Sequence, residues 1–213
     1  LGPLLFVIYI NDLPENIASI VYMYADDTKM FRRVDGEWDR RVMQRDLDQL
    51  AEWAEKWQLR FNVDKCKIMH LGKVENVRSV YSMPGVGGQR LVLQETVKEK
   101  DLGVWISNTL KPISHVTHAV NTANRILGLI RRTFTYLNGE IMKQLYTSLV
   151  RPHLEYGNVV WHPFFKKDIA LLEAVQHRAT RMIPGMKDLA YEERLRQIGL
   201  PSLDYRRLRG MQL

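Results

Sequence analysis

The chain has 213 residues, of which 46% are hydrophobic and 26% charged. These proportions are typical of globular proteins and exclude a disordered or fibrous chain. The longest apolar run, residues 4–10, is too short to cross a bilayer, so we expect no membrane segment. The one cysteine, Cys66, excludes an intrachain disulfide framework and disfavours a thiolate zinc cage. The sequence begins at Leu1 without a basic segment, so we expect a fragment with no readable signal peptide.

Charge is distributed unevenly along the chain. Residues 1–108 carry 15 basic and 16 acidic side chains, a net charge of −1. Residues 109–213 carry 16 basic and eight acidic side chains, a net charge of +8, and 11 of the basic residues are arginine. This asymmetry favours a polyanion-binding half, and a merely solvated basic surface is the alternative.

The first expected element is a mostly buried apolar helix over residues 3–13, which Pro14 ends. Residues 19–34 then hold two runs rich in β-branched and aromatic side chains, with an acidic pair between them. This pattern predicts an antiparallel β-hairpin with Asp26 and Asp27 at its turn. Both runs carry enough apolar side chains to pack on the helices to either side, including the first helix around Leu5.

Residues 37–58 have a helical period, and Leu50 lies in the apolar stripe on which the hairpin is expected to pack. Trp53 and Trp57 in this helix are expected to pack in the core, and a ligand-binding aromatic pair is the alternative. The full stripe comprises Met43, Leu47, Leu50, Ala54 and Trp57.

Short strands are expected next, at residues 59–62, 66–71, 90–93 and 102–107. The glycine-rich stretch 84–88 has no lysine-serine pair and no helix after it, so it predicts a hairpin turn and not a phosphate-binding loop.

From residue 113 onward the pattern is helical. Three long apolar stripes lie within residues 116–134, 141–149 and 169–182, and shorter amphipathic segments follow at 191–198 and 202–209. Pro152 is expected to end or kink the second helix. A domain boundary is therefore expected near residues 108–112, where the charge balance also changes.

Two adjacent aspartates at a hairpin turn repel each other and suit a strand poorly, so a positive partner is expected for Asp26 and Asp27. A divalent cation that prefers oxygen ligands, such as Mg²⁺, is that partner, and in phosphoryl transfer it offsets charge developing on the reacting oxygens. The alternative is a solvated acidic turn without a ligand.

The segment Tyr24-Ala25-Asp26-Asp27 resembles the YxDD box of reverse transcriptases, and Ala25 to Lys29 has the form typical of non-LTR (LINE-type) elements of the jockey and CR1 kind. Further blocks resemble other motifs of that family in the family's own order. They comprise residues 1–6 and 10–14 before the box, then 46–47, 53, 57 and 61–67 of the next palm motif, 100–104 of the primer-grip hairpin, and 149–156 and 191–195 of the thumb region.

The resemblance implies an α+β fold, an incomplete right-hand polymerase palm of a β-hairpin and sheet with packed helices, followed by an all-helical thumb. Residues 1–72 correspond to the C-terminal part of the palm, 73–108 to a primer-grip-like β region, and 109–213 to the helical thumb and downstream region. It also implies an RNA template, a DNA primer and deoxynucleoside triphosphates as partners, two Mg²⁺ or Mn²⁺ ions as cofactors, and a nuclear location.

By the same resemblance, Asp26 is a direct metal ligand, Asp27 supports the site beside the primer end, and Tyr24 lies under the primer terminus. Lys65 corresponds to a lysine near the departing pyrophosphate, and a plain surface lysine is the alternative. Leu102 and Gly103 belong to the primer-grip hairpin. Phosphate contacts are expected from basic helices, although each arginine could also be merely solvated; the five are Arg125, Arg131, Arg132, Arg178 and Arg181.

The sequence also departs from the family pattern. The family's first metal-binding aspartate and its fingers lie upstream of Leu1, and Asp12 is no replacement because it follows a helix. Since half of the carboxylate set is missing, we expect this chain alone to be inactive. The alternative function is a non-catalytic nucleic-acid-binding module or a decayed mobile-element remnant. His115 and His118 have i, i+3 spacing, but with no further ligand indicated a packing or solvent role is favoured over zinc.

Overall fold

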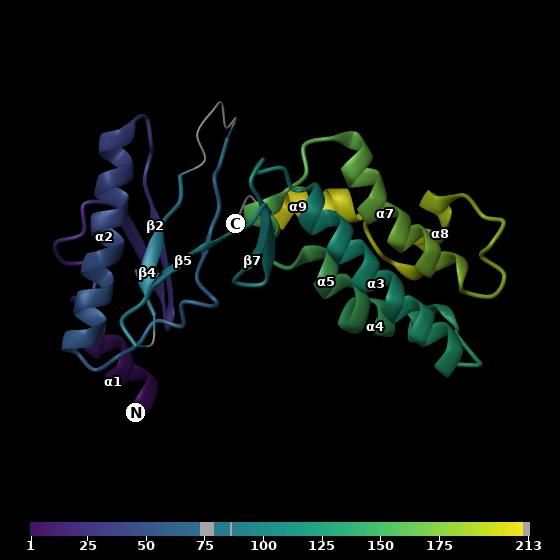
Figure 1. Cartoon of the computed structure of the whole chain (residues 1–213). Helices are drawn as coiled ribbons and strands as arrows, with labels where there is room; N and C mark the ends of the chain where they lie inside the picture. The colour runs from purple at the N-terminus through teal and green to yellow at the C-terminus, as the bar shows by residue number, and fades with distance from the viewer. Residues whose placement is uncertain (73–78, 86, 211–213) are drawn as a thin grey trace. The chain divides into compact units, whose positions relative to one another are not determined.

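The computed structural model describes residues 1–72, 79–85 and 87–210. The chain forms two compact units, which divide between Val97 and Lys98 (Figure 1). The first unit carries a net charge of −1 and the second a net charge of +8. This division lies before the expected boundary at 108–112, because the hairpin of residues 98–107 packs on the helix that follows it. Residues 73–78 of the expected β region and Val86 of the glycine-rich stretch lie outside the described residues.

The first unit combines two helices with short strands. The predicted hairpin is confirmed: β1 (Ile20–Tyr24) pairs with β2 (Asp27–Phe31) in antiparallel register, with Tyr24 opposite Asp27. The predicted second helix is also confirmed, as α2 (Glu37–Lys56). Short pairs complete the unit, with β4 (Ser82–Pro84) antiparallel to β5 (Arg90–Val92) and β3 (Lys67–Ile68) parallel to β6 (Gln94–Glu95).

The first helix, α1 (Gly2–Tyr9), corrects the expectation of a buried apolar element over residues 3–13. None of its residues is buried, and Leu5 is 55% exposed. The helix is apolar on every side, and seven of its eight residues are exposed, with Phe6 half-buried. At the end of the helix, the hydroxyl of Tyr9 donates to the carbonyl of Trp57 and the two rings meet edge to face.

One expected strand does not form. Residues 59–62 have no strand partner, because α2 closes with Gln58 in the left-handed region (φ 57°) and the Leu59 amide donates back to the Ala54 carbonyl. The described residues of the glycine-rich stretch agree with the expected hairpin turn, since β4 before it pairs with β5 after it and the Gly85 amide donates to the Gln89 carbonyl at 2.8 Å.

The second unit begins with the antiparallel hairpin β7 (Lys98–Asp101) and β8 (Val104–Ser107). Helices follow to the end of the described chain, and the three predicted long stripes lie within α3, the α4–η1–α5 segment and α7. The elements are α3 (Ile113–Thr133), α4 (Gly139–Leu145), the π-helical turn η1 (Tyr146–Val150), α5 (Arg151–Glu155), α6 (Asn158–Trp161), α7 (Lys166–Arg181), α8 (Tyr191–Ile198) and α9 (Leu203–Gly210). The wide turn η1 directly precedes α5, whose second residue, Pro152, has no amide hydrogen to give to the helix ladder.

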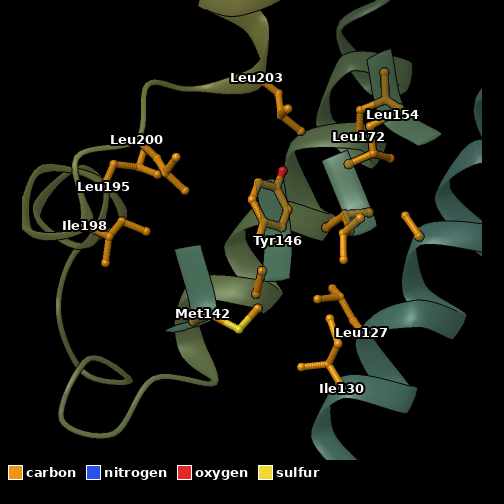
Figure 2. Close-up of a cluster of buried hydrophobic side chains, with 14 of the residues drawn as sticks. Leu127, Ile130, Met142, Tyr146, Leu154, Leu172, Leu195, Ile198, Leu200 and Leu203 are labelled. Carbon is orange, nitrogen blue, oxygen red and sulfur yellow. The ribbon is translucent and has the colours of Figure 1, made fainter. Parts of the chain in front are cut away.

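One hydrophobic core holds the second unit together (Figure 2). Leu127 and Ile130 of α3 meet Met142 of α4 and Tyr146 of η1, and Leu172 of α7 closes the same cluster. Helix α3 packs along both α5 and α7 (Figure 1). Among the helices described, none has both the length and the apolar character needed to cross a bilayer.

Candidate active site and nucleic-acid surface

The acidic turn of the first unit presents the YxDD residues to solvent. Ala25 and Asp26 form a two-residue turn between β1 and β2, with Ala25 in the left-handed region (φ 52°). Asp26 lies in this turn, and Asp27 is the first residue of β2. Both carboxylates are exposed, and Tyr24, which pairs with Asp27, is 66% exposed. The carboxylates of these two consecutive residues are therefore both accessible to solvent.

The hairpin is fixed to α2 through a buried carboxylate. Asp46 is fully buried and accepts hydrogen bonds from the Ser19 amide (2.8 Å), the Ser19 hydroxyl (2.6 Å) and the Ala18 amide (3.3 Å). Met30 of β2 packs on the hydrophobic cluster that contains Leu47 of α2. The start of β1 is therefore held by Asp46, and β2 is held by the packing of Met30. The acidic turn connects these two anchored strands.

The structure does not join Lys65 to the acidic turn. Lys65 lies in an exposed turn just before β3, where its amide donates to the Asn62 carbonyl at 2.9 Å. Within the described part of the chain, no hydrogen bond or ion pair connects its side chain to Asp26 or Asp27.

Leu102 and Gly103 form the tip of the β7–β8 hairpin in the second unit. Both residues have positive φ (42° and 88°), the conformation of a tight two-residue hairpin turn. The hydroxyl of Tyr156 donates to the Leu102 carbonyl at 2.8 Å. A Cβ atom added at Gly103 would lie 2.8 Å from the Tyr156 ring, so the ring closes over the glycine. The tip is thereby locked to the segment that follows α5.

The five candidate arginines are all exposed on the two longest helices of the second unit. Arg125, Arg131 and Arg132 lie on α3, the last two in its final turn, and Arg178 and Arg181 lie in the last turn of α7. The side chain of Arg178 donates to Asn124, so Arg178 and Arg125 lie on adjoining helices next to this bridge.

Other arginines of the basic half are buried, which the charge count could not show. Arg194 is 1% exposed and donates to the His177 carbonyl at 3.1 Å. Arg207 is fully buried and lies 3.5 Å from Asp204, and burial lowers the pKa of its guanidinium. The sequence does contain one indication that Arg194 and Arg207 are buried. A helical period places both on the apolar faces of their helices, with Leu195, Ile198 and Leu203.

The two histidines considered for zinc contact aromatic rings instead. His115 is buried, accepts the Trp105 amide at 3.1 Å through Nδ1, and its ring centroid is 4.5 Å from that of Trp161. Burial, and then His118 and Lys98, lower the pKa of His115 to about 4.

Trp53 also takes a structural role, as its indole donates to Asp12 at 3.1 Å and thus ties the segment after α1 to α2.

The donor chemistry of the acidic turn fits a hard divalent cation, because carboxylate oxygens are the ligands that Mg²⁺ prefers. Two carboxylates alone do not complete a coordination shell. Among the residues that the structure describes, no group of three or more histidine, cysteine, aspartate or glutamate side chains is placed to hold a metal ion.

Comparison with known proteins identifies the relatives of this chain. It is 24% identical over 197 residues to the RNA-directed DNA polymerase from mobile element jockey of Drosophila melanogaster. It is 24% identical over 197 residues to the probable RNA-directed DNA polymerase from transposon X-element of the same species. Both alignments cover 87% of this chain and 21% of the relative, so the chain spans about a fifth of their length. No solved structure gives a significant match.

A family match gives the same assignment. The family described as reverse transcriptase (RNA-dependent DNA polymerase) matches residues 1–137, which include the acidic turn, the β1–β2 and β7–β8 hairpins and the whole of α3. The resemblance to reverse transcriptases is thereby confirmed over most of the chain. Since this match covers more than half of its length, and since its relatives include the RNA-directed DNA polymerase from mobile element jockey, this chain belongs to the reverse transcriptase family.

Proposed function

We propose that this chain forms part of the RNA-directed DNA polymerase of a non-LTR mobile element, where it contributes two catalytic carboxylates and a basic helical surface. The observation that carries the proposal is the display of Asp26 and Asp27 on an exposed hairpin turn. In this assignment residues 1–72 belong to the palm, 73–108 to the primer-grip region, and 109–213 to the thumb and downstream region.

In the complete enzyme, Asp26 and Asp27 would hold Mg²⁺ or Mn²⁺. The ions would supply stabilisation of the charge that develops on the attacking and leaving oxygens. The exposed ring of Tyr24 is one strand position from the turn, where it would support the primer terminus. Lys65 would act at the departing pyrophosphate, which requires the remainder of the enzyme to bring it near the turn.

The basic helices would hold the nucleic acid. Exposed guanidinium groups on α3 and α7 would contact phosphates, and the locked tip at Leu102 and Gly103 would present a rigid backbone edge to the primer. The partners are therefore an RNA template, a DNA primer and deoxynucleoside triphosphates. A nuclear location follows for an enzyme that copies RNA at chromosomal sites.

We further propose that the chain alone does not support polymerisation, because two carboxylates cannot position two metal ions. Extension of a DNA primer on an RNA template should be undetectable with Mg²⁺ and residues 1–213. Extension that Asp26→Asn abolishes would show that the chain is sufficient and would contradict this part of the proposal.

The metal role is tested directly with Mn²⁺, which broadens NMR signals near its binding site. Backbone amides of residues 24–28 should broaden at lower Mn²⁺ concentrations than other amides. The double variant Asp26→Asn/Asp27→Asn should remove this selectivity. Asp35→Asn, another exposed aspartate just after the hairpin, should preserve it. Broadening that is spread evenly over all acidic surfaces would refute a metal site at the turn.

A further inference from the structure

One face of the β7–β8 hairpin gathers cationic and aromatic side chains. Lys100 and Trp105 are cross-strand partners, and Lys98 lies two residues from Lys100 on the same strand. The Lys98 ammonium is 4.7 Å from the centre of the Trp105 ring. The ring of His118, from α3, is 5.5 Å from the same indole. These four residues, Lys98, Lys100, Trp105 and His118, are called the hairpin basic face.

Contacts with other elements hold the hairpin beneath this face. The Trp105 amide donates to the buried His115, which itself packs on Trp161. The hairpin tip is held by the hydroxyl of Tyr156. The indole of Trp105 can therefore act as a fixed platform that keeps one lysine and one histidine close together, and such preorganisation reduces the entropy lost when a ligand binds.

The charged groups acting on His118 share one sign. Burial is the first cause that lowers the pKa of its imidazole, followed by the charges of Lys100 and Lys98 on β7, Arg125 on α3 and His153 on α5. The neighbouring His115 has a pKa of about 4 and is neutral near pH 7. Positive groups on β7, α3 and α5 thus surround the exposed imidazole of His118. Their repulsion opposes its protonation until an anion is present.

We propose that the hairpin basic face binds a phosphate group of a nucleic acid, and that His118 takes up a proton when this phosphate binds. The inference rests on the proposed function, since it gives that function a defined contact. Lys98 and Lys100 supply permanent charge, Trp105 positions them, and His118 supplies a contact whose charge depends on pH. A phosphodiester stays ionised near neutral and mildly acidic pH, so the group that changes its charge belongs to the protein.

The linkage has a definite sign. A bound phosphate favours the charged imidazole and raises the pKa of His118 relative to the free chain. Above the pKa of the bound form, affinity does not depend on this group. As the pH falls from that value toward the pKa of the free form, affinity rises by up to about tenfold per pH unit. Below the pKa of the free form, the gain is complete.

The experiment uses the full chain and a rhodamine-labelled RNA–DNA hybrid, followed by fluorescence anisotropy at constant ionic strength between about pH 5.5 and 8. The wild-type chain should bind about three- to tenfold more tightly at the acidic end. His118→Gln should flatten this dependence. His118→Lys carries its charge throughout and should bind at pH 8 at least as tightly as the wild type, also with a flat profile. The control His70→Asn, in the first unit, should keep the wild-type profile.

NMR titration of the His118 imidazole with and without a short unlabelled hybrid provides a second measurement. Its pKa should rise in the presence of the hybrid. Unchanged titration, or a wild-type pH profile in both His118 variants, would overturn the inference while leaving nucleic-acid binding intact. Absence of hybrid binding at every pH would overturn the nucleic-acid part of the proposed function as well.

Discussion

Asp46 is a charged side chain in the middle of the buried stripe of α2, between Val42 and Leu50. Its carboxylate is fully buried and accepts three hydrogen bonds from Ala18 and Ser19. A buried carboxylate is stable only when such donors replace the lost water. Asp46 therefore acts as the anchor that fixes the start of β1, and the acidic turn depends on it.

Replacing Asp46 with alanine should lower the free energy of unfolding by about 2–3 kcal/mol, because two amides and a hydroxyl lose their acceptor. The control Glu52→Ala removes an exposed carboxylate from the same helix and should change stability by less than about 0.5 kcal/mol. Equilibrium urea unfolding measures both. Equal effects of the two substitutions would show that the anchor contributes nothing.

The residues of the acidic turn could be predicted from the sequence, whereas the anchor could not. Tyr24, Asp26 and Asp27 are adjacent, so a local hairpin pattern was enough to place them together. The partners of Asp46 lie 27 and 28 residues away. Its place in an apolar stripe was a readable signal of burial, but the identity of the donors depends on how β1 packs on α2.

At the scale of elements, the β7–β8 hairpin shows how a turn is fixed by a distant side chain. Gly103 has φ 88° and lies directly under the Tyr156 ring. A side chain at this position would be disfavoured by both the backbone conformation and the ring. The glycine is thus required by the turn and by its packing.

Gly103→Ala should destabilise the chain by more than about 1 kcal/mol, through backbone strain and displacement of the Tyr156 ring. The control Gly128→Ala lies within α3, where a Cβ meets nothing within 4 Å, and should stabilise by about 0.5–1 kcal/mol. Thermal unfolding followed by circular dichroism distinguishes the two signs. A neutral or stabilising Gly103→Ala would contradict the role assigned to Tyr156.

Long periodic elements followed their patterns more closely than short ones. Helices α2, α3 and α7 form where apolar residues recur with helical spacing over many turns. The expected strand at 59–62 has only four residues, and the helix-closing hydrogen bond from Leu59 to Ala54 prevents its pairing. The high hydropathy of α1 predicted burial wrongly, because burial requires a covering partner as well as an apolar sequence.

For the whole molecule, net charge is separated between the two units. The second unit carries +8, and its exposed arginines include the five on α3 and α7 as well as Arg196 and Arg209. Arg194 and Arg207 are buried, and Arg206 pairs with Glu155 at 2.6 Å. Buried or paired guanidinium groups contribute less to phosphate binding than free ones. The positive charge available to the phosphates of a nucleic acid is therefore smaller than the net charge of +8.

Binding of the chain to an RNA–DNA hybrid should weaken with salt, with a log–log slope on the order of 3 to 5, because only part of the positive charge engages phosphates. Arg131→Ala/Arg132→Ala should reduce affinity and lower the slope by about 1 to 2. The control Arg40→Ala/Arg41→Ala removes a neighbouring pair from the first unit and should leave the slope unchanged. Anisotropy titrations at several salt concentrations provide the slopes, and a slope near zero would exclude the basic helices as a phosphate surface.

The sequence by itself determined the local hairpin of the acidic turn, the long amphipathic helices, the uneven charge and the family, since each depends on residues that are near in sequence or on order along the chain. Tertiary structure alone decided the anchor at Asp46, the lock of Tyr156 on Gly103, the burial of Arg194 and Arg207, and the meeting of Lys98, Trp105 and His118. Each of these depends on contacts between different elements. Periodicity shows which face of an element is apolar, but packing selects what that face meets.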